Sequence, residues 1–399
     1  MYNVRNVTDD IVWVGASDRR LALFENIFPI PRGVSYNSYV LLDEKTVLLD
    51  TVDAGVAGQF FENLEYVLDG RKLDYLVVNH MEPDHCAMIG DIVRRYPEVQ
   101  VVGNAKTFTM MKQFFGTDFA ERAVTVKEGD TLSSGKHTLH FVMAPMVHWP
   151  EAMVTYDEMD KVLFSADGFG TFGALNGNIF ADEVDFDRDW LDDARRYYTN
   201  IVGKYGASVQ ALLKKAAGLD IAVICPLHGS VWRENLGYIL EKYQKWSTYE
   251  SEDQAVVIMY ASMYGNTASA ADALAGRLAA KGVKKIAVYD VSNTHVSELI
   301  SEIFRASHLV FAAPTYNAGI YPVMENLLSD MKALAVQKKT VALMENGTWA
   351  AMTAKQMREK LSELKDMTIL DTQVTVKSSM AADQADELEA FADAIVESM

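Results

Sequence analysis

The chain has 399 residues, of which 49% are hydrophobic and 23% charged, a composition typical of a globular protein with two or three domains. Its formal net charge of −18 argues against nucleic acid as a partner, because phosphate binding requires a basic surface. No uncharged apolar run approaches the ~20 residues of a membrane helix, and residues 1–10 lack an apolar signal core. We therefore expect no membrane association and a cytoplasmic location. Cys86 and Cys225 are too few for a disulfide framework or an iron–sulfur cluster, and we expect buried thiols.

The first part of the chain alternates short apolar strands with helices, which indicates an α/β fold. The predicted strands cover residues 11–14, 21–24, 34–42, 46–49, 73–78, 99–102, 138–145, 161–166 and 220–226. The predicted helices cover residues 59–68, 88–96, 106–115, 191–205 and 208–217. Asp50 follows the hairpin formed by strands 34–42 and 46–49, and we expect its carboxylate to accept backbone amide hydrogen bonds rather than bind a metal.

The most informative stretch is Asn79-His80-Met81-Glu82-Pro83-Asp84-His85, which follows the buried strand predicted over residues 73–78. Pro83 cannot continue a strand, so we expect this stretch to form a loop at the strand's C-terminal end. Its candidate metal ligands are His80, Glu82, Asp84 and His85. Two imidazoles and two carboxylates this close together either converge on a cation or point into water, and this stretch alone does not decide between the two.

The same arrangement recurs at the ends of three later strands. The loops after these strands carry His148, Asp167 and His228. The other histidines, His137, His140, His295 and His308, do not share this placement. Because open α/β sheets place their functional sites at the C-terminal ends of strands, we expect the four loops to meet at one metal site.

A polar, acidic segment over residues 246–254 predicts a domain boundary, so that residues 1–250 and 251–399 form separate domains. Strands are predicted over residues 255–260, 285–291, 308–313, 340–344 and 368–376. Helices are predicted between them, over residues 269–281, 296–306, 321–335 and 354–365. This alternation is typical of a doubly wound, parallel, five-stranded sheet.

Three loops of this second domain predict a site for flavin mononucleotide (FMN). The first runs from a strand into a helix, and its hydroxyl, amide and glycine groups at the helix N-terminus suit a monophosphate. It has no lysine, unlike the Gly-Lys-Ser/Thr loop of kinases. The other two loops supply the aromatic faces of Tyr316 and Trp349 for a flat ring. The candidate FMN contacts are Ser262, Met263, Tyr264, Gly265, Asn266, Thr267, Pro314, Thr315, Tyr316, Asn317, Ala318, Gly319, Asn346, Gly347, Thr348, Trp349 and Ala350.

Together, the metal loops and the phosphate loop make the chain similar to a known family over essentially its whole length. The N-terminal part resembles the metallo-β-lactamase αββα sandwich and the C-terminal part resembles flavodoxin. Their fusion in this order resembles the flavodiiron proteins, also called A-type flavoproteins. The resemblance implies a non-haem diiron site in which Asp167 bridges the irons. It implies His80, Glu82 and His148 on one iron, and Asp84, His85 and His228 on the other, with coordination by His85 variable within the family.

The donor set favours iron on chemical grounds as well. Metallo-β-lactamase-like zinc hydrolases typically have histidine where this chain has Glu82. With Asp84 and Asp167 the site then offers three carboxylates, whose hard oxygen donors suit redox-cycling iron better than zinc, although they do not exclude zinc or manganese.

The resemblance also implies the reaction and the partners. Members of the family reduce nitric oxide to nitrous oxide, dioxygen to water, or both, with FMN returning electrons to the irons, which detoxifies these gases. Two cysteines cannot form a rubredoxin module within this chain, so we expect an external donor such as rubredoxin or a reduced deazaflavin. The family further implies a head-to-tail homodimer or a dimer of dimers. Trp349 would then lie between the flavin and the partner's metal loops, or else simply pack in the flavodoxin core.

Two other functions remain open on sequence grounds. One is a metallo-hydrolase fused to a flavodoxin electron carrier of unrelated purpose. The other is a non-enzymatic electron carrier with a structural metal.

Two neighbouring tyrosines, Tyr197 and Tyr198, lie on a predicted helix of the metal domain. We expect either that one of them reaches the metal pocket or that both pack in the core.

Overall fold

A computed structural model describes residues 1–399, and its internal contacts divide the chain into two compact units. The N-terminal unit comprises Met1–Tyr198 and Ala207–Tyr243, and the C-terminal unit comprises Thr199–Gly206 and Gln244–Met399. The domain boundary between residues 250 and 251 stays a prediction. Every helix of the structure is too short or too polar to cross a membrane.

The N-terminal unit contains two sheets. The larger has seven strands in the order β1-β2-β7-β8-β9-β10-β11, and its β8, β9, β10 and β11 are parallel. The smaller has five strands in the order β12-β13-β14-β15-β16, with only β15 and β16 parallel. Two further pairs are antiparallel, β3 with β6 and β4 with β5.

The strands of this unit are β1 (Arg5–Asn6), β2 (Ile11–Trp13), β3 (Ala16–Asp18), β4 (Leu23–Phe24), β5 (Phe28–Pro29), β6 (Val34–Tyr36), β7 (Tyr39–Leu42), β8 (Thr46–Leu49), β9 (Tyr75–Val77), β10 (Gln100–Gly103), β11 (Ala123–Thr125), β12 (Thr131–Ser133), β13 (Thr138–Met143), β14 (Met153–Asp157), β15 (Val162–Phe164) and β16 (Val223–Cys225). The helices are α1 (Ala57–Leu68), α2 (Pro83–Cys86), α3 (Ile89–Arg95), α4 (Ala105–Phe115), α5 (Phe186–Asp189), α6 (Leu191–Tyr197), α7 (Gly206–Ala216) and α8 (Leu236–Ser247).

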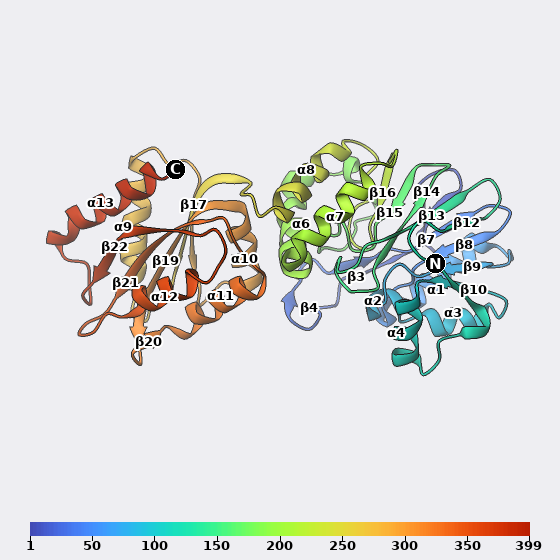
Figure 1. Ribbon diagram of the computed structural model, residues 1–399, viewed down its shortest axis with the longest axis horizontal. Helices are drawn as coiled ribbons and strands as arrows, with labels where there is room; N and C mark the ends of the chain where they lie inside the picture. The colour runs from blue at the N-terminus through green and yellow to red at the C-terminus, as the bar shows by residue number, and fades with distance from the viewer. The chain divides into compact units, whose positions relative to one another are not determined.

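The helices of the N-terminal unit flank its two sheets (Figure 1). Helices α1 to α4 lie beside the seven-stranded sheet and α6 to α8 beside the five-stranded sheet, as the αββα prediction requires. Local sequence sets their ends. For example, Asn104 caps α4 by accepting hydrogen bonds from the amides of Lys106 and Thr107 at 3.0 and 3.2 Å. The same helix ends at Gly116, whose φ of 71° favours glycine.

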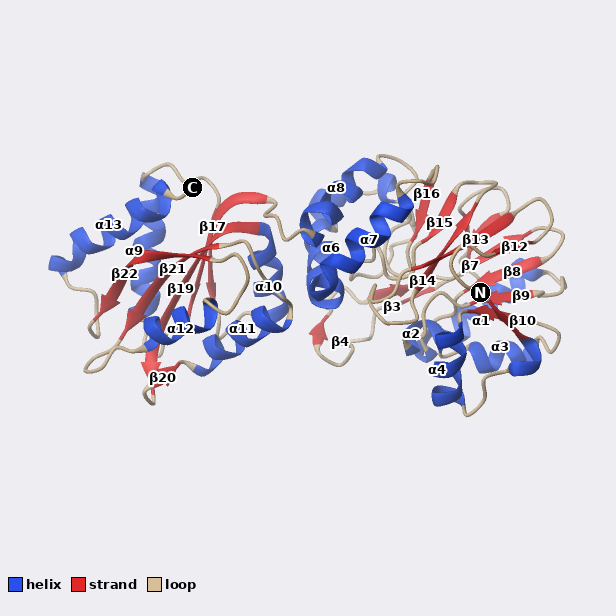
Figure 2. Ribbon diagram, in the orientation of Figure 1, coloured by secondary structure: helices blue, strands red, loops and turns tan.

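The C-terminal unit is built on one parallel sheet in the order β18-β17-β19-β21-β22, with β20 added antiparallel to β19. Its strands are β17 (Asp253–Tyr260), β18 (Ile286–Asp290), β19 (Ala306–Tyr316), β20 (Gly319–Ile320), β21 (Thr340–Asn346) and β22 (Thr368–Val376). Its helices are α9 (Asn266–Ala280), α10 (Val296–Arg305), α11 (Pro322–Ala333), α12 (Thr353–Leu361) and α13 (Ala385–Glu397). The five-stranded doubly wound prediction is confirmed, and Figure 2 shows helices on both sides of the sheet.

The core on one side of this sheet explains why the sequences of its strands are unbroken apolar runs. Alternate side chains of β17, β19, β21 and β22 pack against α9 and α13, whereas the residues between them face the other helices. Both faces of the strands are therefore buried, as parallel sheets require. Val256 and Ile258 of β17 meet Leu274 of α9 and Phe391 of α13 in this core, and all four are fully buried.

Several local predictions were wrong. Asp84 and His85 lie not on an extended loop but on α2, because Pro83 at its first position starts a helix as readily as it ends a strand. The polar segment predicted over residues 246–254 begins inside a helix, since α8 continues to Ser247 and the Trp246 indole is fully buried. The predicted helix over residues 191–205 ends as α6 at Tyr197 and continues as irregular helical turns.

Strand β14 and helices α8 and α13 have no counterpart among the predicted elements. β14 is a short segment, and its strand character depends on pairing with β13 on one side and β15 on the other. Such pairing joins segments that are distant in sequence and therefore leaves little local signal.

Lys339, immediately before β21, is a buried lysine. Its ammonium donates to the carbonyls of Phe304 and Ala306, both at 2.9 Å, and to the Ser251 hydroxyl at 2.7 Å. The residue is 3% exposed, and burial lowers its pKa to about 7. It ties the segment that enters β17 to the ends of α10 and β19.

This pKa predicts a pH-dependent stability. Between pH about 7 and 10.5 the unfolded chain holds the Lys339 proton and the folded chain does not, so stability rises with pH over that window. Lys339→Met should remove this component, so that the difference in free energy of unfolding between wild type and variant changes by up to about 1.4 kcal/mol per pH unit. Urea denaturation at a series of pH values measures it. The exposed Lys332→Met is the control, and an equal pH slope in both variants would contradict the prediction.

Candidate metal centre and nucleotide cavity

The four loops singled out in the N-terminal half do meet, at one edge of its two sheets. His80 follows β9 of the larger sheet, and the other three follow β13, β15 and β16 of the smaller one. The seven candidate side chains are all buried, at exposures of 0% for His80, His85, Asp167 and His228, 7% for His148, 8% for Asp84 and 9% for Glu82. The C-terminal ends of strands from two sheets thus enclose one cluster.

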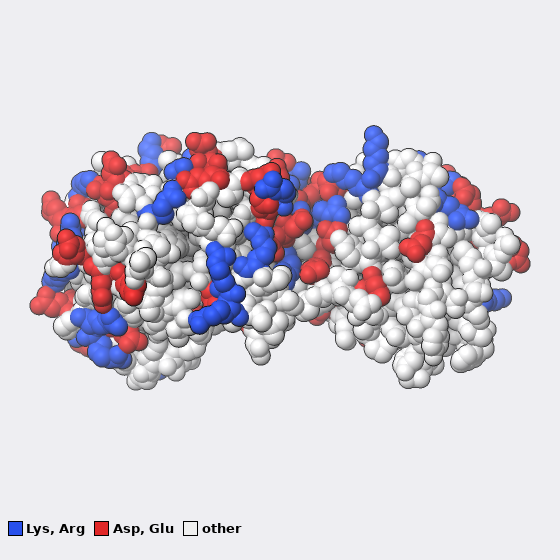
Figure 3. Space-filling view, turned by 180° about the vertical axis from the view of Figure 1, so that it is seen from behind, with Lys and Arg blue, Asp and Glu red and all other residues white.

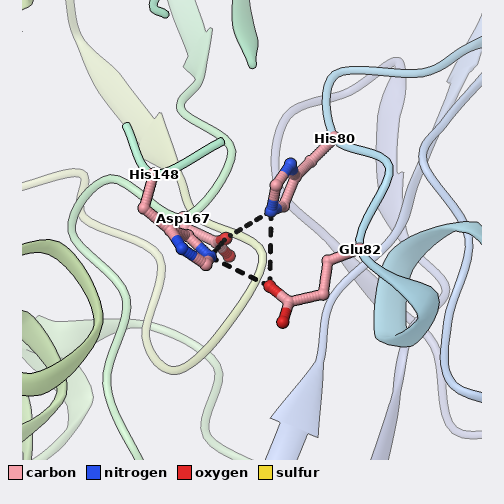
Figure 4. Close-up of side chains that lie close together, drawn as sticks. All are labelled: His80, Glu82, His148 and Asp167. Carbon is pink, nitrogen blue, oxygen red and sulfur yellow. Dashed lines mark hydrogen bonds and ion pairs between the residues drawn. The ribbon is translucent and has the colours of Figure 1, made fainter. Parts of the chain in front are cut away.

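The first part of the cluster is formed by His80, Glu82, His148 and Asp167, which point toward one another in Figure 4. His148 Nε2 lies 2.9 Å from Glu82 Oε2 and 3.2 Å from Asp167 Oδ2. His80 Nε2 lies 3.4 and 3.1 Å from the same two oxygens. Two imidazole nitrogens and two carboxylate oxygens therefore converge within a space that suits a single cation.

The second part of the cluster is formed by Asp84, His85 and His228. Asp84 Oδ2 lies 3.4 Å from His85 Nε2 and 3.3 Å from His228 Nε2. The two imidazole nitrogens are 3.0 Å apart. His85 thus directs its Nε2 into the cluster.

Asp167 connects the two parts, because its two oxygens face different groups. Oδ2 lies beside His80 and His148, and Oδ1 lies 3.3 Å from His85 and 3.6 Å from His228. Both Asp167 oxygens, both Asp84 oxygens and His80 Nε2 are buried without a hydrogen bond of good geometry. Buried polar atoms left without such partners are costly unless a cation binds them, so these residues fit a pair of metal ions that share Asp167.

The ionisation of the cluster supports the same conclusion. Burial lowers the pKa of His148, but the adjacent carboxylates of Asp167 and Glu82 outweigh burial and raise that pKa to about 9. Burial raises the pKa of Glu82, but its hydrogen bonds to His148 and His80 hold that pKa well below its usual range. Without a cation the imidazoles would therefore carry protons to balance the carboxylates, and metal binding replaces those protons.

A third group, Asp10, His137 and Asp160, lacks these features. His137 lies between Asp157, at 3.0 Å from its Nδ1, and Asp10, at 3.3 Å from its Nε2. Asp10 also pairs with Lys136, and Asp160 accepts from the Thr8 hydroxyl. Its groups are satisfied by protein partners, so it has the character of a structural network.

Asp50 plays the predicted structural role, holding the first metal loop from behind. Its Oδ1 accepts from the amides of Asn79 at 2.7 Å and His80 at 3.3 Å, and its Oδ2 accepts from the Asn79 side chain at 2.8 Å. Burial raises the pKa of Asp50 to about 6. The carboxylate fixes the backbone at the start of the loop, although it reaches this loop rather than the turn after its own strand.

Sequence reasoning missed two carboxylates at the site. Glu151 lies directly behind His80, with Oε1 2.8 Å from His80 Nδ1. It stands three residues after His148 in the sequence. Glu25, on the turn between β4 and β5, faces Glu82, and desolvation of its carboxyl group together with the Glu82 charge raises the pKa of Glu25 to about 8. No local pattern marks Glu25, because tertiary folding alone brings it to the site.

Tyr197 is the tyrosine that lines the cluster. Its ring is fully buried, with its centroid 5.4 Å from that of His228. Tyr198 is also fully buried and stacks edge-on against Tyr243, at 5.0 Å. Cys86 and Cys225 are buried free thiols, as expected.

The C-terminal unit has a cavity of about 430 Å³ at the C-terminal ends of β17, β19 and β21. The predicted contacts that line it are Ser262, Met263, Tyr264, Asn266, Thr267, Pro314, Thr315, Asn317, Ala318, Asn346, Gly347, Thr348, Trp349 and Ala350. Met352 and Ser378 also line it and were not predicted, whereas Gly265, Tyr316 and Gly319 are in the same loops without lining the cavity.

The loop before α9 has the features of a phosphate cradle. Gly265 has a φ of 92° and leaves the helix N-terminus without a side-chain cap. The Ser262 hydroxyl accepts from the Gly265 amide at 3.1 Å, which closes the loop. Asn346 donates to the Thr267 hydroxyl at 3.3 Å and so joins two of the loops. A helix N-terminus with free amides and no neighbouring lysine suits a monophosphate such as that of FMN.

The rim of this cavity is unusually apolar. The large hydrophobic side chains exposed in the C-terminal unit all belong to its three loops or follow them: Met263, Tyr264, Tyr316, Trp349 and Met352. Trp349 is 93% exposed, so it does not pack in the flavodoxin core. A flat aromatic ligand and a covering protein surface would both bury this rim.

Comparisons with known proteins identify the family of each part of the chain. The family model of the ODP family beta lactamase matches residues 34–229, and that of flavodoxin matches residues 258–394. The nitric oxide reductase of Moorella thermoacetica is 33% identical over 93% of this chain and 92% of its own length. The anaerobic nitric oxide reductase flavorubredoxin of Vibrio vulnificus is 32% identical over 90% of this chain and 73% of its own.

Two solved structures share the fold over nearly their whole length. The rubredoxin:oxygen oxidoreductase of Desulfovibrio gigas has a TM-score of 0.91 and 30% identity, covering 99% of this chain and 98% of its own. The flavodiiron protein of Giardia intestinalis has a TM-score of 0.92 and 26% identity, covering 100% of this chain and 96% of its own. The fold is therefore a metallo-β-lactamase-like domain followed by a flavodoxin-like domain. The chain belongs to the flavodiiron protein family.

The bridging position of Asp167 predicts a specific loss of metal. Asp167→Ala should lower bound iron and abolish activity, because it removes one ligand from each position and leaves four imidazoles to repel one another when protonated. Elemental analysis of the purified variant measures this. Asp157→Ala is the control. Asp157 is as buried as Asp167, but it contacts His137, which lies outside the cluster. A normal metal content with full activity in Asp167→Ala would contradict the assignment.

Proposed function

We propose that this protein is an oxidoreductase that reduces nitric oxide to nitrous oxide, dioxygen to water, or both, and thereby detoxifies these gases. The reaction would take place at a non-haem diiron site that FMN re-reduces. The observation that carries the proposal is the Asp167 carboxylate, which offers one oxygen to each of two buried ligand groups. Family membership supports it.

The proposed ligands are His80, Glu82 and His148 on one iron, with Asp84, His85 and His228 on the other and Asp167 shared. His85 is included because its Nε2 lies within 3.4 Å of both Asp84 and Asp167. The three carboxylates favour iron over zinc, since hard oxygen donors stabilise the ferric state.

When bound, the irons would supply the electrons for reduction of the gas, and the flavin would restore those electrons. The two oxygens of Asp167 face both ligand groups, so this residue would help to hold both metals. Glu82 and Asp84, one from each ligand group, are its most exposed members and form the edge that a small gas would approach. The remaining ligands are buried from water.

FMN would be held by its phosphate at residues 262–267 and by its ring between residues 314–319 and 346–350. The cavity volume and the apolar rim support this assignment. The donor of electrons to FMN would be a separate molecule, rubredoxin or a reduced deazaflavin, because Cys86 and Cys225 are both buried and too few to bind iron themselves. A cytoplasmic location fits these donors and the free thiols.

We further propose a head-to-tail homodimer, alone or paired into a dimer of dimers. The flavin of one chain would then lie beside the irons of the other. The exposed rim around Trp349 supports this arrangement, because a partner surface would bury five large hydrophobic side chains.

An anaerobic assay tests the function. The purified protein should contain two irons and one non-covalent FMN per chain, released on denaturation with one phosphate per flavin. After chemical reduction it should consume nitric oxide, dioxygen or both, and comparing the two rates gives the preference. Recovery of FAD or of no flavin would contradict the FMN site. Hydrolytic activity with zinc that is indifferent to flavin reduction would indicate the alternative, a fused metallo-hydrolase, and bound cofactors without gas turnover would indicate an electron carrier.

Mixed dimers test the assembly. One variant, Asp167→Ala, should lack iron, and a second, with Ser262 and Thr267 both changed to Ala, should lack FMN. Each alone should be inactive. In a head-to-tail dimer of the two, one junction keeps both cofactors and the other loses both, so co-expression should restore activity. Mixed dimers that form but remain inactive would show that electrons pass within one chain.

A further inference from the structure

The two proposed metal positions have matching sets of direct ligands. Each has two imidazoles, one carboxylate of its own and one oxygen of Asp167. The direct ligands therefore give no reason for the two metals to differ.

The groups behind the imidazoles do differ. His80 Nδ1 contacts the Glu151 carboxylate at 2.8 Å, whereas His228 Nδ1 donates to the neutral Ser35 carbonyl at 2.7 Å. His85 Nδ1 is buried without a hydrogen-bond partner. A carboxylate is thus in direct contact with the outer nitrogen of a histidine of the first position. Neither histidine of the second position has a carboxylate within hydrogen-bond distance of its Nδ1.

Glu151 is held firmly in this orientation. Its Oε1 also accepts from the Met81 amide at 2.8 Å, and its own carbonyl accepts from the Asn104 side chain at 2.6 Å. The residue is 1% exposed, and its Oε2 is buried without a partner. The nearby Lys106 ammonium donates to the Pro150 carbonyl instead.

A buried carboxylate needs a compensating positive charge. Glu151 forms an ion pair with His80 alone, so the compensating charge must come through His80. A carboxylate that accepts the outer N–H of a metal-binding histidine fixes its tautomer and raises its basicity as a ligand.

We propose that Glu151 is a positioning residue that makes the two metals inequivalent. It holds His80 with the proton on Nδ1 and the lone pair of Nε2 toward the metal, and it makes the metal at His80 the more electron-rich of the two. That iron is then the first to lose an electron when an electrode or mediator dye oxidises the diferrous centre to the mixed-valent state. This inference rests on the diiron centre of the proposed function.

The test compares Glu151→Gln with wild type. The amide keeps the size and an acceptor oxygen but removes the charge. We expect iron affinity at one position to fall about 10- to 100-fold in competition with a chelator. In ⁵⁷Fe Mössbauer spectra one of the two iron signals should shift and the other stay in place. The potential of the couple between the mixed-valent and diferrous states should rise, because the ferric ion at His80 loses the negative charge that stabilised it.

The control is Asp157→Asn, which neutralises a carboxylate of equal burial behind His137, away from the cluster. It should leave affinity, spectrum and potential unchanged. A second readout is independent of iron: in zinc-loaded protein, ¹⁵N-histidine NMR should show the His80 Nδ1 proton protected in wild type and shifted or exchanging in Glu151→Gln. If Glu151→Gln does not fold, Glu151→Asp replaces it, with the same shifts expected in smaller amount.

The proposal is overturned if Glu151→Gln leaves both the potential and the spectrum as in wild type. It is also overturned if both iron signals change together, since the effect would then not be confined to one position. These results are separate from the fate of the proposed function. A wild-type protein that binds two irons and reduces neither gas would refute the function, while the spectra would still decide the role of Glu151.

Discussion

The N-terminal unit depends on the concentration of charge around Asp167. This fully buried carboxylate is shared by four imidazoles, and two further carboxylates, Glu82 and Asp84, enter the same cluster. Such a set is costly without cations, because unpaired buried charges and unsatisfied lone pairs are unfavourable. A cation at each position would convert this cost into binding free energy. The proposed metal centre would therefore serve the reaction and also stabilise the loops that surround it.

The scaffold controls this cluster through neutral and charged groups behind the ligands. Asp50 fixes the backbone before His80, the Ser35 carbonyl orients His228, and Glu151 orients His80. These contacts come from different strands and loops, which explains why two sheets are needed to build the site. They also give each histidine its own electrostatic surroundings, so two positions with the same direct ligands need not behave alike.

The candidate site of the C-terminal unit differs from the metal cluster in its charge. Its cavity carries no buried cluster of charge and relies on a helix N-terminus, backbone amides and an apolar rim. An anionic phosphate and a flat ring suit such a site, because the helix dipole favours the anion while the exposed aromatic groups favour the ring. Leaving Trp349 and its neighbours exposed would be unfavourable unless a ligand and a second surface cover them.

The sequence by itself determined the class of fold and all seven proposed ligands. Strands buried on both faces are unbroken apolar runs, and polar residues directly after them must lie at the sheet edge, so His80, His148, Asp167 and His228 could be recognised locally. Only the tertiary structure decided that Asp84 and His85 belong to a helix and that Glu25 and Glu151 join the site. Those facts depend on the packing of segments far apart in sequence. Local propensity and periodicity carry no information about such contacts.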